Sequence, residues 1–136
     1  MKKILFLALI LMSLAGCKKD KDNPAPELSA RIAGTYKAIK LTYGGIDIPL
    51  TAASQSELTI TVDKSGADAI TGKIKIKLEG QVTEDTFGPL NLKDSGDGGV
   101  DIYESSQKVG NISKTHLMNI TSEEDGVEMN IIAQRQ

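Results

Sequence analysis

The chain has 136 residues, a formal net charge of −2 at pH 7, and 4% aromatic residues. Nucleic-acid binding needs an excess of positive charge to displace counterions, so this balance disfavours a nucleic-acid partner. The single cysteine, Cys17, excludes an intramolecular disulfide and any metal site that requires several thiolates.

The first sixteen residues have the features of a secretory signal peptide. Lys2 and Lys3 precede an unbroken apolar run over residues 4–12, and small residues follow at Ser13, Ala15 and Gly16. The run is much shorter than the roughly 20 residues that a membrane-spanning helix needs. We therefore expect residues 1–16 to be removed from the mature protein.

The only cysteine follows this segment directly. Residues 14–17 read Leu-Ala-Gly-Cys and resemble the lipobox of bacterial lipoproteins. The resemblance implies that the thiol of Cys17 receives a diacylglyceryl group and that cleavage leaves Cys17 as the first residue. Two or three acyl chains, palmitate among them, would then hold the protein on a membrane. The alternative is a lone cysteine that follows an ordinary signal peptide.

Residues 17–27 are expected to be a lipidated tether between the membrane and the folded domain. Lys18 favours the outer membrane, because an aspartate in that position would resemble an inner-membrane retention signal. The charged run over residues 18–22 looks like a motif that sends lipoproteins to the cell surface, or it is a solvated spacer. Pro24 and Pro26 forbid a helix and favour an extended chain.

The folded domain is expected over residues 28–136, a length typical of one domain. Its clearest strands alternate apolar and polar residues with a period of two, at residues 58–62, 73–79 and 127–134. In the second of them Lys73, Lys75 and Lys77 share one face. We expect that face to lie in solvent, as in an antiparallel sheet with one wet side.

Weaker strand candidates lie at residues 35–43, 46–50, 82–92 in one or two pieces, 99–104, 108–113 and 115–121. Short turn signals such as Gly44-Gly45 and Asp125-Gly126 separate them, so strands pair with their sequence neighbours. The sequence therefore predicts an all-β antiparallel meander of about eight strands. Closure into a barrel would hide the strand edges, and a β-sandwich is the alternative because it alternates in the same way.

Gly34, Thr35 and Tyr36 open the first strand after a lead-in that could form one helical turn at residues 28–33. The three residues are similar to the Gly-x-Trp motif that opens lipocalins and the small lipocalin-like domains of bacterial lipoproteins, with Tyr36 in place of the tryptophan. The resemblance extends over residues 28–136 in strand pattern and length. It implies a small lipocalin-like barrel.

Few residues indicate chemistry. His116, the only histidine, alternates with apolar residues and is expected in the core or at its rim. The acidic segments at residues 94–101 and 123–125 are read as hairpin turns, since the first fails the spacing of a calcium-binding EF-hand. Glu84 and Asp85 are adjacent on a strand and point to opposite faces, which weakens them as an acid/base pair. We expect no catalytic residue, no metal site and no cofactor, hence no enzyme.

Three functional classes remain from the sequence, of which an enzyme is the least favoured. In the first, the barrel interior holds a small apolar ligand and is lined by inward-facing residues such as Leu58, Ile60, Val62, Ile74, Ile76 and Leu78. In the second, the barrel has a filled core and presents its rim loops to an envelope protein or to glycan. The large aliphatic residues in these positions lean slightly towards a filled core.

Overall fold

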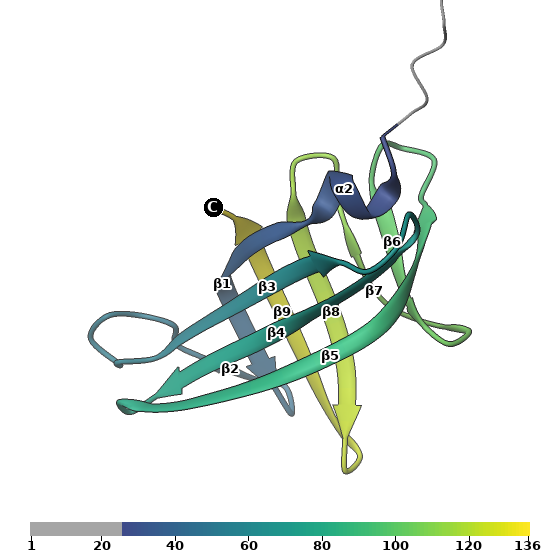
Figure 1. The fold of residues 1–136 in the computed structure, drawn as a ribbon. Coiled ribbons are helices and arrows are strands. Elements are labelled where there is room, and N and C mark those ends of the chain that lie inside the picture. The colour runs from purple at the N-terminus through teal and green to yellow at the C-terminus, as the bar shows by residue number, and fades with distance from the viewer. Residues whose placement is uncertain (1–25) are drawn as a thin grey trace, which may run out of the picture.

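The computed structural model describes residues 26–136, and the chain there folds into one helix and nine strands (Figure 1). The helix α2 spans Leu28–Ile32, which agrees with the predicted helical turn. The strands are β1 (Gly34–Tyr43), β2 (Ile46–Ile48), β3 (Glu57–Lys64), β4 (Ala69–Leu78), β5 (Gln81–Asp94), β6 (Val100–Glu104), β7 (Gln107–Ile112), β8 (Leu117–Glu124) and β9 (Val127–Arg135).

All nine strands belong to one antiparallel sheet in which neighbours in sequence are neighbours in space from β3 to β9. Strand β9 returns to pair with β1, so that β1 and β3–β9 form a closed barrel of eight strands. Strand β2 is an additional hairpin partner of β1 at residues 41–43. The predicted barrel meander is thus confirmed, and the β-sandwich is excluded.

Alternation places the apolar residues of each strand inside the barrel. Leu58, Ile60 and Val62 of β3 are at most 2% exposed, and they form one core with residues from seven other strands and from α2. The neighbouring threonines of β3 face outwards. The lysine face of β4 is exposed as predicted, because Lys73 pairs across the sheet with Thr61 on the outer surface.

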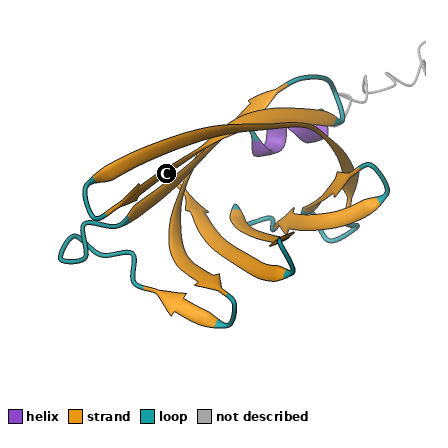
Figure 2. Cartoon of the chain, turned by 90° about the horizontal axis from the view of Figure 1, so that it is seen from below, coloured by secondary structure: helices purple, strands orange, loops and turns teal. Residues whose placement is uncertain are grey.

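Helix α2 closes one end of the barrel. Figure 2 looks into the barrel from the opposite end, with the helix on the far side. Ile32 is 2% exposed and joins the core, and its carbonyl oxygen accepts a hydrogen bond of 2.7 Å from the hydroxyl of the fully buried Tyr36. Burial of a side chain such as Ile32 contributes about 1.5–3 kcal/mol. Tyr36 therefore connects the first strand to the helix.

Two arginines hold α2 over this end. Nη1 of Arg31 lies 2.9 Å from Oδ2 of Asp94, and its Nη2 donates to the carbonyl oxygen of Gly98 at 2.6 Å. From the C-terminal strand, Nη1 of Arg135 donates to the backbone oxygen of Arg31 at 3.2 Å. Since these partners come from opposite parts of the barrel, the helix cannot swing away without breaking several contacts.

The opposite end of the barrel has a gap in its wall. Strand β5 pairs with β6 only through residues 91–94, and β7 pairs with β8 only through residues 110–112. Residues 81–90 of β5 pair with β4 alone, and within the described chain no strand lies along their other edge. The short β6–β7 hairpin therefore covers only the half of the barrel that lies next to α2.

One predicted core residue was placed wrongly. Leu78 is 41% exposed, because the β4–β5 hairpin continues beyond the level at which the other strands can cover it. Ile76, two residues earlier, is half-buried.

The predicted signal peptide, Cys17 and most of the tether lie outside the described residues. Over residues 26–136 the search for a helix long and apolar enough to cross a membrane found none.

Candidate ligand-binding cavity

A cavity of about 340 Å³ lies inside the barrel at the end opposite α2. Its apolar wall comes from β4, β5, β7, β8 and β9 and consists of Ile74, Phe87, Leu90, Val109, Ile120, Met129 and Ile131. Small-molecule sites are typically about 300–1,000 Å³ and are mostly apolar. The volume and the lining thus suit a small apolar molecule.

Register and bulges direct these side chains inwards. Phe87 lies opposite Gly72, on the inner face that also carries Ile74. Between β6 and β7 the register shifts, since Ile102 pairs with Gly110 and the next residue of β6 pairs with Lys108. Val109 is the extra residue of this bulge, and its side chain lines the cavity. A β-bulge is a common way to re-aim a side chain beside a site.

The polar part of the lining is small. It consists of Glu104 at the end of β6 and Ser122 on β8, and Thr86 of β5 borders it with a side chain on the outer face, where Thr86 pairs with Lys73. The three residues lie towards the open end and next to the gap between β5 and β8. The arrangement is an apolar interior with a few polar groups at its mouth, which orients an amphipathic molecule with its polar end outwards.

The sequence located the interior correctly but not the cavity within it. Of the six residues expected to line it, Ile74 does so, whereas Leu58, Ile60 and Val62 are packed in the filled half. The barrel is therefore filled near α2 and open at the other end. The alternation of residues 127–134 was a usable signal for Met129 and Ile131.

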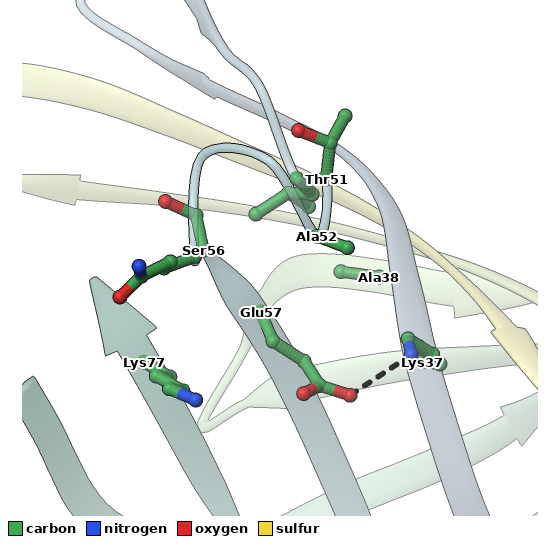
Figure 3. A pocket seen from close by; sticks show the side chains of 9 residues that line it. Lys37, Ala38, Thr51, Ala52, Ser56, Glu57 and Lys77 are labelled. Atoms are coloured by element: carbon green, nitrogen blue, oxygen red, sulfur yellow. Dashed lines mark ion pairs between the residues drawn. The ribbon is translucent and has the colours of Figure 1, made fainter. Parts of the chain in front are cut away.

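A second depression lies on the outside, where β3 diverges from β1 (Figure 3). Its volume is about 290 Å³, and the loop at residues 50–56 forms one wall. Lys37 and Glu57 face each other across it at 2.9 Å (Figure 3), and the hydrogen bond and charge of Lys37 hold the pKa of Glu57 below its usual range. Lys37 and Glu57 thus neutralise each other, and Lys77, which also lines the depression, takes part in no ion pair of the described residues.

His116 was expected in the core or at its rim, and it lies at the rim of the closed end. It has a φ of 59° and precedes β8 in a turn where its N–H donates to the carbonyl oxygen of Ser113 at 2.9 Å. Its side chain is half-buried near Arg31 and Arg135, and its Nδ1 has no hydrogen-bond partner among the described residues. These neighbours are cationic, so the surroundings of His116 do not resemble a metal site.

The acidic segment at residues 94–101 is the β5–β6 turn. Oδ1 of Asp94 accepts from the N–H of Gly96 at 2.7 Å, and Oδ1 of Asp97 accepts from the N–H of Gly99 at 2.9 Å. These hydrogen bonds, together with Arg31 for Asp94 and Ser95 for Asp97, lower the pKa of both carboxyls. The carboxylates stabilise their own turn, and within residues 26–136 no group of three or more candidate ligands could hold a metal ion.

Comparison with known proteins found no family model that matches the chain and no curated protein that matches it.

Proposed function

We propose that the protein is a lipoprotein, anchored to the outer membrane through Cys17, whose lipocalin-like barrel binds a small apolar ligand without catalysis. The observation that carries the ligand proposal is the cavity of about 340 Å³ with seven apolar side chains in its wall. The signal-peptide pattern and the Leu-Ala-Gly-Cys segment support the anchor.

The filled half of the barrel supports this proposal too. Tyr36, Ile60 and Ile112 are 0% exposed, and the base of the barrel is closed by α2. Stability can therefore come from one half while the other half keeps exposed apolar surface that a ligand would bury. Transfer of apolar surface from water contributes about 25 cal/mol per Å².

Native mass spectrometry tests ligand binding. The full chain with Cys17→Ser, expressed in a bacterial envelope, should retain a small apolar molecule. Ile120→Phe adds volume inside the cavity and should abolish retention, because Ile120 is part of the wall. Ile132→Phe is the matched control: its neighbours Ile131 and Ala133 face inwards, so residue 132 faces outwards.

Retention of the same mass by Ile120→Phe and by the control would contradict the cavity as the binding site. If the unmodified cavity retains nothing, a role as an interaction protein becomes the better function. The free edge of β5 at residues 81–90 favours that second candidate, since unpaired backbone groups can accept a strand from a partner.

Fractionation of cells tests the anchor. Cys17→Ser should move the protein from the outer-membrane fraction to the soluble fraction and leave the circular dichroism spectrum of the barrel unchanged. The reason is that acyl chains supply the membrane affinity, whereas the described domain contains its own core. A variant that still sediments with outer membranes would contradict lipidation at Cys17.

A further inference from the structure

The polar groups around the cavity carry charge of one sign. Among the described residues that line it, Glu104 alone is charged and Ser122 adds a hydroxyl, whereas Thr86 pairs in register with Lys73 of the exposed lysine face, so its side chain points outwards. Lysine and arginine are absent from this part of the described wall. The mouth therefore presents one carboxylate and one hydroxyl.

Glu104 reaches the mouth because of its place in β6. Val100 and Ile102 are 1% exposed and face the core, and Glu104 follows with the same spacing of two at the end of the strand. Across the gap, Asp85 of β5 pairs in register with Ile74, which places it on the inner face of the sheet. Two carboxylates thus belong to the inward-facing rows on either side of the gap.

The cations nearest to this mouth along the chain are engaged elsewhere. Lys108 lies 2.8 Å from the carboxylate of Asp101, and Lys93 lies 4.5 Å from the centre of the Tyr103 ring. Among the ion pairs of the described residues, none includes Glu104 or Asp85. Glu104 therefore has no ion-pair partner among the described residues, and Oδ1 of Asp85 accepts a hydrogen bond of 2.8 Å from the N–H of Thr86.

We propose that the natural ligand is an apolar molecule with a positively charged amine head group, which lies at the mouth beside Glu104 while the apolar part fills the cavity. This inference rests on the proposed ligand-binding function. A fatty acid of similar size would bring a second negative charge to the same place, where like charges repel. Glu104 therefore selects the charge of the head group, and the volume of the cavity limits the size of the apolar part.

Two probes of equal chain length test the preference. Decylamine is protonated and decanoic acid is ionised at neutral pH, and each can displace the neutral dye Nile red from the full chain carrying Cys17→Ser. An exposed ion pair contributes about 0.2–1 kcal/mol and tenfold in affinity corresponds to about 1.4 kcal/mol. Because one probe is attracted and the other repelled, we expect decylamine to bind about three- to tenfold more tightly at low salt.

Glu104→Gln should remove most of this preference by weakening decylamine and strengthening decanoic acid. The matched control is Glu123→Gln, since Ser122 lines the cavity and its neighbour Glu123 lies exposed on the other face of β8. This control removes the same charge at the same end of the barrel and should keep the preference. Thermal unfolding of both variants checks that the barrel is intact.

Equal binding of the two probes, tighter binding of decanoic acid, or a preference that survives Glu104→Gln would overturn the inference and leave the cavity function standing. Failure of both probes to displace the dye from a folded protein would overturn the cavity function and this inference together.

Discussion

The phenyl ring of Phe87 lies over Gly72, its partner on the neighbouring strand. A Cβ atom added to Gly72 would stand 2.5 Å from Cζ of Phe87 and would also collide with the carbonyl oxygen of Thr61. The ring thus occupies the space that a side chain of β4 would fill. Glycine at this position lets an aromatic wall of the cavity pack directly against backbone.

Gly72→Ala should therefore destabilise the barrel by about 1–3 kcal/mol, because the backbone of β3 cannot move aside cheaply. Urea unfolding measures the loss. Gly66→Ala is the control, since its added Cβ would meet only Ala69 at an ordinary 3.6 Å. If both variants lose the same stability, the contact between Phe87 and Gly72 is not the cause.

Substitution of two isoleucines tests whether the filled and the open half of the barrel contribute differently to stability. Ile60 is 0% exposed and Ile76 is half-buried near the end of β4. Ile60→Ala should cost about 2–5 kcal/mol as lost transfer energy and a cavity, whereas Ile76→Ala should cost less than about 2 kcal/mol. Denaturant unfolding at constant m-value compares them. Equal losses would mean that the core extends to the open end.

Tyr36 should make the free energy of unfolding decrease at alkaline pH. Burial raises its pKa to about 12 from an ordinary value of 10.0, with Arg135 opposing the rise. The unfolded chain then releases this proton at lower pH than the folded chain. The stabilisation is complete below pH 10 and declines by about 2–3 kcal/mol as the pH rises from 10 to 12.

Tyr36→Phe should remove this decline and lose the hydrogen bond to Ile32, at a cost of about 1 kcal/mol or more at neutral pH. The parent protein should be the more stable one at neutral pH, and its advantage should shrink above pH 10 and reverse by about pH 12. A difference that stays constant over this range would show that the hydroxyl is not held neutral by burial.

The lysine face of β4 should tolerate substitution. Lys73 lies 3.5 Å from Glu84, with both side chains about half exposed, so their pairing contributes little. Replacement of Lys73, Lys75 or Lys77 singly by Thr should change the unfolding free energy by less than about 0.5 kcal/mol. A loss above about 1 kcal/mol in thermal or urea unfolding would mean that this face is covered.

The strands were predictable because their period is local. Alternation needs only a few consecutive residues, and from β3 to β9 short turns pair each strand with its neighbour in sequence. Strand β3 is the clearest case, since the alternation over residues 58–62 places Leu58, Ile60 and Val62 in the core. The barrel follows from many such local preferences that agree with each other.

Bulges were not predictable from the same pattern. Register in β1 shifts between Ala38 and Lys40, which leaves Ile39 as an extra residue that is 63% exposed. Inward positions change at this point from Ala38 to Leu41. Alternation read from the sequence cannot show such a shift, because it depends on the hydrogen bonds that β9 offers.

The position of the cavity depends on long-range register as well. Ile60 and Ile74 pair across β3 and β4, yet Ile60 is fully buried and Ile74 lines the cavity. Partners across the sheet thus differ in burial, although both strands alternate in the same way. Sequence patterns of one strand contain no information about the length of a strand that faces it across the interior.

If Cys17 carries the proposed lipid, the two ends of the barrel lie at different distances from the membrane. The described chain begins at Pro26 beside α2, at the closed base, and the ten residues between Cys17 and Leu28 span at most about 35 Å. The base would therefore be the end nearer to the lipidated residue, and the mouth with Glu104 would be the end farther from it. A ligand would then be taken from or released to water rather than from the lipid phase, so its exchange would not require extraction from the membrane.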